Sequence, residues 1–149
     1  NFDILIIQFG MNDCNYWETD QGFPRVSKDG FKANLNEIID RGKNFGAKLI
    51  MLNTNHPTPR KENFKHLNFS YQKSNYDYNK IIREVVKDRN DVVLNDVEDQ
   101  IFKLINNKQV DIYDIVLNDK LHLSLEGHKI YFDIISNNIN NHILKTFAT

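Results

Sequence analysis

Three short apolar segments recur along the chain, and each has the length of a strand rather than of a helix. Residues 3–9, 48–53 and 91–95 are rich in isoleucine, leucine and valine. Continuous apolar runs of this length, without polar alternation, are typical of strands buried on both faces, as in a parallel sheet. The pattern therefore predicts three buried strands.

Apolar residues at helical spacing lie between and after these segments. Over residues 29–45 they recur every three or four positions, Ser27 is a candidate N-cap, and Gly46 marks the end of the pattern. Further helical patterns cover residues 78–86, 97–105 and 130–147. Strands that alternate with helices predict an α/β fold, with helices on both faces of a parallel sheet.

The second predicted strand is followed by a long polar stretch, residues 54–69. It contains His56-Pro57-Thr58-Pro59. Because proline lacks a backbone N–H and fixes its own φ angle, two prolines here exclude a regular helix or a central strand. We expect a long loop.

The composition fits one globular domain without a strong electrostatic field. The 149 residues are 40% hydrophobic, and 19 basic residues are balanced by 20 acidic ones. Such a balance gives no overall attraction to nucleic acid or to an anionic membrane, and no apolar run approaches the roughly 20 residues that span a bilayer. We expect a single domain over residues 1–149. One cysteine, Cys14, excludes an internal disulfide and leaves the compartment open.

A polar segment with candidate chemistry directly follows the first predicted strand. In Gly10-Met11-Asn12-Asp13 the glycine permits a tight exit, and Asn12 can present its side-chain amide at the carboxyl edge of the sheet, where open α/β sheets bind ligands. Such an amide can donate a hydrogen bond to an oxyanion. Asparagine and aspartate after a strand are also common turn formers, so this segment alone leaves both interpretations open.

A second polar segment precedes the last predicted helix. Asp119 and His122 are three residues apart on an expected turn. At that spacing the carboxylate can reach the Nδ1 proton of the imidazole, which leaves Nε2 free to act as a general base toward a hydroxyl nucleophile. Exposed pairs of this kind also occur in ordinary loops, so the pair by itself does not decide the function.

Taken in order, these segments resemble the SGNH hydrolase family, also described as GDSL-like lipases and acylhydrolases. Members carry an apolar strand ending in G-x-N-D and a D-x-x-H motif before an amphipathic C-terminal helix, as at residues 10–13 and 119–122 here. The second strand and the His56–Pro59 segment are similar to the family's fourth strand and active-site loop. The resemblance spans essentially the whole chain and implies a flavodoxin-like, three-layer α/β/α fold with a parallel sheet.

The resemblance also implies a role for each residue of the candidate site. Asn12 would donate to the oxyanion, His122 would be the general base, and Asp119 would orient it. Gly10 and His56 would belong to the substrate-binding surface.

Other polar residues near these motifs are expected to have structural roles. Asp13 would support its turn, and His128 would lie on the surface of the last helix. No metal site is expected, because three histidines lack partners at metal-ligand spacing: His56, His66 and His142. No glycine-rich phosphate-binding motif is present either, so we expect no cofactor.

The family pattern opens with a strand leading to a Gly-Asp-Ser nucleophile, and no serine here stands in such a turn. The serines are Ser27, Ser70, Ser74, Ser124 and Ser136. Ser124 is near His122 but precedes an amphipathic helix, so we interpret it as an N-cap. We expect the chain to be N-terminally truncated relative to the family, with the nucleophile and two strands in a preceding segment or a partner chain. The outer edge of the first strand would then lie open, and this chain alone would be inactive.

These features predict an ester hydrolase that acts by a Ser-His-Asp mechanism on a small-molecule or carbohydrate ester. Two alternatives stay open: an acyltransferase, and a non-catalytic domain that binds a glycan or has a structural role. Tyr16, Trp17 and Phe23 follow the Asn12 segment. They would either form a platform for an acyl group or a sugar, or simply pack their loop.

Overall fold

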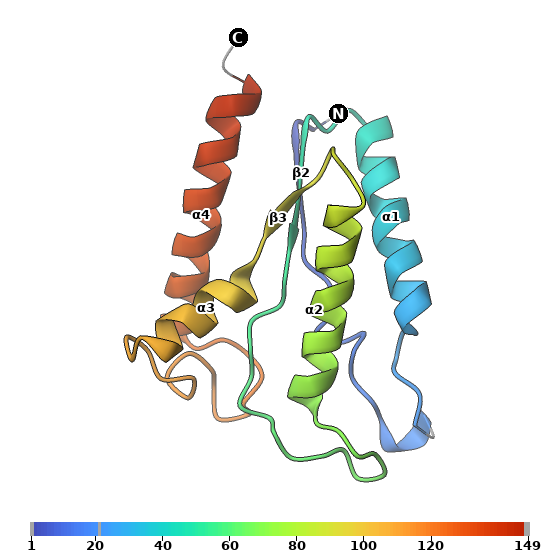
Figure 1. Ribbon diagram of the computed structural model, residues 1–149, viewed down its shortest axis with the longest axis vertical. Helices are drawn as coiled ribbons and strands as arrows, with labels where there is room; N and C mark the ends of the chain where they lie inside the picture. Colours follow the sequence, from blue (N-terminus) through green and yellow to red (C-terminus); the bar gives the residue numbers. More distant parts are fainter. Residues whose placement is uncertain (1, 21, 148–149) are drawn as a thin grey trace.

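The structure, a computed structural model, describes residues 2–20 and 22–147 and has helices on both faces of a small parallel sheet (Figure 1). The strands lie side by side in the order β1 (Ile4–Ile7), β2 (Leu49–Asn53) and β3 (Val93–Asn95). The helices are α1 (Lys28–Asn44), α2 (Tyr71–Lys87), α3 (Val97–Asn106) and α4 (Leu125–Phe147), with a 3-10 turn at Glu18–Asp20. The predicted α/β class is confirmed.

The central strand, β2, shows why the fold has three layers. All five of its residues are buried, and it pairs in parallel with β1 on one side and β3 on the other. Its alternate side chains Ile50 and Leu52 belong to the core formed with α1 and α2. On the opposite face, Asn53 Nδ2 donates to Tyr131 Oη of α4 over 3.1 Å. Helices therefore cover both faces, as the buried apolar run predicts.

The helix caps expected from the sequence are present. Ser27 Oγ accepts the Gly30 N–H over 3.1 Å, and Ser124 Oγ accepts the Gly127 N–H over 3.1 Å. Gly46, at φ +98°, ends α1 in a conformation that side chains disfavour. Although α4 is long, no helix within the described residues is both long and apolar enough to cross a bilayer.

The first strand differs from the prediction that it is buried on both faces. Ile6 is 43% exposed, and β1 pairs only with β2 within the described residues. The prediction that its outer edge lies open is confirmed for this part of the chain. The apolar side chains of β1 are therefore not all covered by the described residues.

The stretch after β2 is a loop, as predicted, but its first six residues, 54–59, are buried. Side chains of α2 take the place of a neighbouring strand here, because buried backbone groups need hydrogen-bond partners. Asn79 accepts the Asn55 N–H over 2.7 Å and donates to the Asn55 carbonyl over 3.0 Å. Asn75 donates to the His56 carbonyl over 3.0 Å. These amides fix the path of the loop toward the candidate site.

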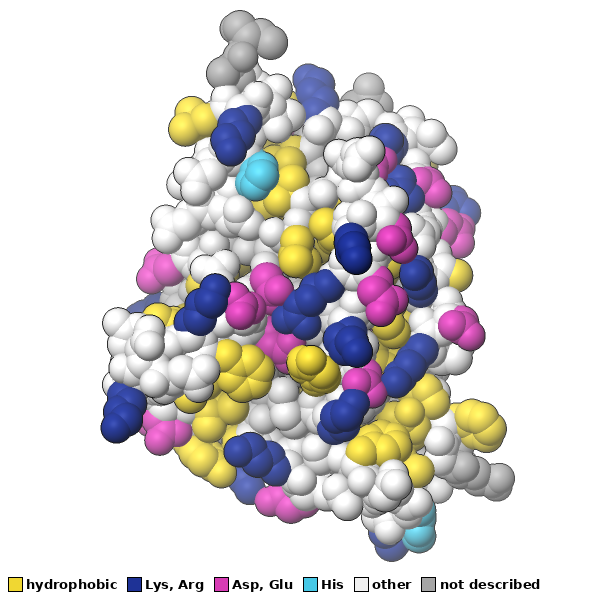
Figure 2. Space-filling view, viewed as in Figure 1, with side chains coloured by type: hydrophobic (Ala, Val, Ile, Leu, Met, Phe, Trp, Pro, Cys, Tyr) yellow, Lys and Arg dark blue, Asp and Glu magenta, His cyan; other side chains and the backbone are white. Residues whose placement is uncertain are grey.

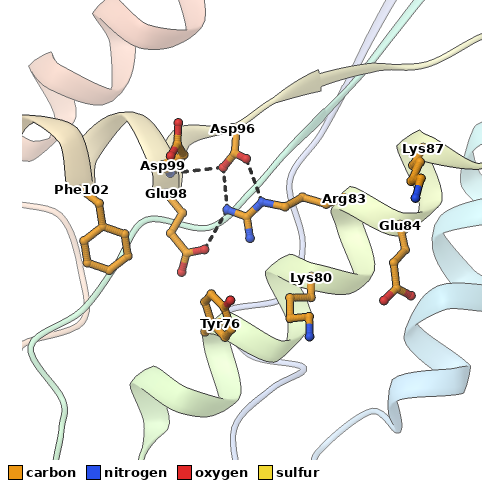
Figure 3. A pocket seen from close by; sticks show the side chains of 9 residues that line it. All are labelled: Tyr76, Lys80, Arg83, Glu84, Lys87, Asp96, Glu98, Asp99 and Phe102. Atoms are coloured by element: carbon orange, nitrogen blue, oxygen red, sulfur yellow. Dashed lines mark hydrogen bonds and ion pairs between the residues drawn. The ribbon is translucent and has the colours of Figure 1, made fainter.

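An ion-pair cluster joins α2 to the start of α3 (Figure 3). Arg83 donates to both Asp96 oxygens over 2.7 Å and to Glu98 over 2.9 Å. Burial raises the pKa of Glu98, and Arg83 opposes that shift. Around the cluster, acidic and basic side chains intermix on the surface of this face (Figure 2). A cavity of about 500 Å³ lies here. Arg83 engages both oxygens of Asp96 and one oxygen of the buried Glu98, so we interpret the cluster as stabilising the α2–α3 packing.

Candidate active site

The turn after β1 is built around Gly10. Its φ of +126° suits only glycine, and a Cβ at this position would lie 2.4 Å from Asn55 Nδ2. The Gly10 N–H donates to Asp13 Oδ2 over 3.0 Å, and its carbonyl accepts the Cys14 N–H over 2.9 Å. The interpretation of Asp13 as a turn residue is thereby confirmed.

Asn12 lies on the exposed outer side of this turn, at the carboxyl end of β1. The turn is fixed on both sides, because Tyr71 Oη donates to the Met11 carbonyl and the Asn15 N–H donates to the Asn12 carbonyl. Within the described residues, the side-chain amide of Asn12 makes no hydrogen bond of its own. It is therefore free to donate to a ligand.

Asp119 and His122 are in direct contact on the loop before α4. His122 Nδ1 lies 2.6 Å from Asp119 Oδ2, while Asp119 Oδ1 accepts the backbone N–H groups of Leu121 and His122 over 2.9 and 3.0 Å. The hydrogen bond from His122 and these two N–H groups lower the pKa of Asp119 to about 2. The carboxylate is therefore ionised at all but strongly acidic pH and fixes the proton of His122 on Nδ1.

The loop that carries this pair is stabilised by a hydrogen bond within it and by an arginine from another loop. The His122 carbonyl accepts the Leu117 N–H over 2.7 Å, and Lys120 has a left-handed φ of +59°. Arg60 then donates twice to the Asp119 carbonyl, over 2.7 and 3.1 Å. The Arg60 guanidinium also lies 5.4 Å from the centre of the Tyr71 ring. One arginine thus links the His122 loop to the helix that fixes the Asn12 turn.

His56 supports the same loop from beneath. It is only 6% exposed, and its Nε2 lies 2.8 Å from the Leu121 carbonyl, so Nε2–H is the donor. Burial lowers the pKa of His56, which favours the neutral ring. Its Nδ1 has no hydrogen-bond partner within the described residues.

These residues meet at a cavity of about 310 Å³. Its lining consists of Gln8, Met11, Asn12, His56, Leu121, His122, Leu123, His128 and Tyr131. The structure therefore brings Asn12, His56 and His122 together, with Asp119 behind His122. Gly10 is part of the same turn as Asn12 but does not line the cavity. His128 is exposed on α4, as expected, but also lines the cavity.

Arg60 and Tyr131 are two contributors that the sequence interpretation missed. Tyr131 belongs to the apolar pattern of the helix predicted over residues 130–147, which indicates packing alone; in the structure it lines the cavity, and burial raises its pKa to about 12. Its position one turn after His128 could have pointed to the site. Arg60 carries no such signal, because it is 59 positions from Asp119 in the sequence.

Each serine of the chain is engaged in local structure. Ser27, Ser70 and Ser124 cap helices. Ser124 Oγ also donates to the Asp114 carbonyl over 2.5 Å. Its proton is therefore not directed at His122, as the proton of a nucleophilic serine would be. The other two hydroxyls donate to backbone carbonyls: Ser74 and Ser136.

The described residues contain no group of three or more histidine, cysteine or acidic side chains that could hold a metal ion. A histidine–aspartate pair and a free asparagine amide at one cavity, at the carboxyl edge of a parallel sheet, are typical of hydrolytic α/β enzymes. The chain belongs to the GDSL-like Lipase/Acylhydrolase family, whose model matches residues 1–130. The family resemblance predicted from the sequence is confirmed.

Among solved structures, the chain is similar to the crystal structure of an acetyl xylan esterase, AlAXEase, with a TM-score of 0.67 and 23% sequence identity. The match covers 92% of this chain and 67% of that one. At this identity the likeness shows a shared fold. No curated protein sequence matches the chain.

Proposed function

We propose that the chain carries the proton-transfer and oxyanion-binding parts of a carboxyl-ester hydrolase site. The observation that supports this most is the 2.6 Å contact between His122 Nδ1 and Asp119, which leaves Nε2 available at the cavity shared with Asn12. We further propose that the nucleophile is a serine of a segment outside these 149 residues, because every serine within them is engaged elsewhere.

In the proposed reaction, His122 Nε2 takes the hydroxyl proton as the serine oxygen attacks the ester carbonyl carbon. The Asn12 amide donates to the oxyanion that forms, and Asp119 stabilises the imidazolium through Nδ1–H. The imidazolium returns the proton to the alkoxide as the ester C–O bond breaks. Water then repeats the sequence on the acyl-enzyme and releases the acid.

The substrate we propose is a short-chain ester, such as an acetyl ester, of a carbohydrate or small molecule. The cavity of about 310 Å³ is at the small end of ligand sites, which suits a short acyl group better than a lipid chain. The fold is also shared with an acetyl xylan esterase.

The experiment that tests this proposal replaces Asn12 by alanine in a polypeptide that includes the serine-bearing segment. We expect kcat for p-nitrophenyl acetate to fall about 100-fold, the usual cost of losing one oxyanion donor. The amide would stabilise the negative charge that forms on the carbonyl oxygen in the transition state, so its loss should affect kcat. Unfolding by urea should be unchanged, since the Asn12 side chain is exposed and makes no hydrogen bond within the described residues.

Asn34→Ala is the matched control, because Asn34 is an exposed amide on α1 and should leave kcat unaltered. Equal rates for Asn12→Ala and the unaltered polypeptide would remove Asn12 from the site. A polypeptide with the serine and an intact fold but no esterase activity would favour the non-catalytic, glycan-binding or structural role.

A further inference from the structure

A second cavity, of about 590 Å³, opens on the loops that follow β1 and β2. Its lining consists of Tyr16, Trp17, Glu18, Gly22, Phe64, Lys65, His66 and Leu67. None of these residues lines the candidate active-site cavity. Figure 2 shows hydrophobic side chains gathered over these loops at the lower right, with histidine and basic side chains beneath them. The cavity is within the usual size range of small-molecule sites.

The aromatic residues of this cavity are packed at Tyr16 and exposed to solvent at Trp17. Tyr16 packs against Phe64 and Phe69, each with ring centres 5.2 Å apart. The two loops are each closed by an isolated antiparallel bridge, Tyr16 with Pro24 and residue 63 with residue 70. Trp17, next to the fixed Tyr16, is 52% exposed even though Arg25 lies over its ring. A large ring on a rigid support is thus presented to solvent.

The residues that line the cavity carry no net charge, although the Arg25 guanidinium lies over one side of the Trp17 ring. Lys65 Nζ lies 3.2 Å from Glu18 Oε2, so the rim's acid and base neutralise each other, and His66 adds a hydrogen-bonding ring. An apolar ring face bordered by donors and acceptors suits a neutral ligand with an apolar face and many hydroxyl groups. A sugar ring has both features.

A continuous series of contacts connects this cavity with the candidate active site. The Phe64 ring, which packs on Tyr16, lies 6.3 Å from the Tyr71 ring, and Arg60 stacks on Tyr71. Arg60 in turn donates to the Asp119 carbonyl. The two cavities are therefore parts of one packed unit with a fixed relative position.

We propose that the Trp17 cavity is a carbohydrate-binding subsite that holds a sugar unit of the ester substrate while another unit presents its ester at His122. The proposal rests on the ester hydrolase function proposed above and adds its substrate class, a neutral oligosaccharide ester.

The test uses the tryptophan itself, since Trp17 is the single tryptophan of the chain. We expect titration of the 149-residue chain with xylotetraose, an unesterified neutral oligosaccharide, to produce a saturable change in tryptophan emission. By calorimetry, Trp17→Ala should raise the Kd at least about tenfold, as expected for a central aromatic contact, and Trp17→Phe should restore most of the affinity. Phe45→Ala, an exposed aromatic at the end of α1, is the matched control and should bind normally.

Binding is measured here without an ester, so it is independent of catalysis. Saturable binding that Trp17→Ala weakens and Phe45→Ala does not supports the subsite, even if Asn12→Ala leaves hydrolysis unchanged and the hydrolase proposal fails. Absence of saturable binding to the intact chain overturns the subsite. Saturation by octanoate with no response to xylotetraose also overturns it, because the cavity would then hold an acyl chain.

Discussion

Replacing His122 by alanine should lower kcat for p-nitrophenyl acetate by about 10⁴-fold or more in a polypeptide that includes the serine-bearing segment. Without the imidazole, nothing on the loop takes the hydroxyl proton, and the Asp119 carboxylate faces solvent. Both side chains are substantially exposed, at 73% for His122 and 42% for Asp119. We therefore expect the folded structure to be retained, as judged by circular dichroism.

His142→Ala is the matched control for this substitution, because it removes an imidazole from the distant half of α4. Its activity should equal that of the unaltered polypeptide. A His122→Ala variant that hydrolyses the ester at the normal rate would exclude His122 as the general base. His128, the other exposed histidine of the cavity, would then be the candidate for that role.

Gly10→Ala should reduce the free energy of unfolding by about 4 kcal/mol, which combines backbone strain with a steric overlap in a packed interior. The φ of +126° disfavours any side chain, and the new Cβ would lie 2.4 Å from Asn55 Nδ2. The Asn55 side chain has no hydrogen-bond partner within the described residues, but the residue is fully buried, so its amide has little room to turn aside. Urea denaturation monitored by circular dichroism measures the change.

Gly22→Ala separates the two contributions to that loss. Gly22 also has a positive φ, +89°, but a Cβ there would meet only Leu67 Cδ2, at an ordinary 3.6 Å. We expect it to cost about 1–2 kcal/mol, from backbone strain alone. Equal losses for the two variants would show that the contact between Gly10 and Asn55 is not the cause.

Much of the fold follows from local sequence patterns. The run over residues 49–53 predicts a buried strand because its apolar residues are continuous, and α1 is predicted because its apolar positions recur at helical spacing between Ser27 and Gly46. The exposure of Ile6 could not be predicted in the same way. Burial of a strand depends on what pairs with it and covers it, and the strand's own residues do not specify that.

Polar residues in the interior were the least predictable part of the fold. Residues 54–59 are polar and contain two prolines, so the sequence predicts a loop but gives no sign that it is buried. The signal lies elsewhere, in Asn75 and Asn79, which are four residues apart on the buried face of α2. Amides at such positions indicate that the helix packs against irregular backbone rather than against side chains.

Only the parts of the candidate site whose residues are close together in the sequence could be predicted. Asp119 and His122 are three positions apart, so a single turn brings them together, and the structure places them 2.6 Å apart. The hydrogen bonds from Arg60 to the Asp119 carbonyl and from His56 to the Leu121 carbonyl depend on how two distant loops pack. Neither contact has a sequence spacing that could reveal it.

Labelling by a serine-reactive fluorophosphonate, with the modified residue identified by mass spectrometry, tests the proposed catalytic arrangement most directly. We expect one serine outside these 149 residues to be labelled in the polypeptide that includes the preceding segment, and the labelling to be lost in His122→Ala. No labelling of a folded polypeptide, labelling of Ser124, or labelling that persists without His122 would contradict the arrangement.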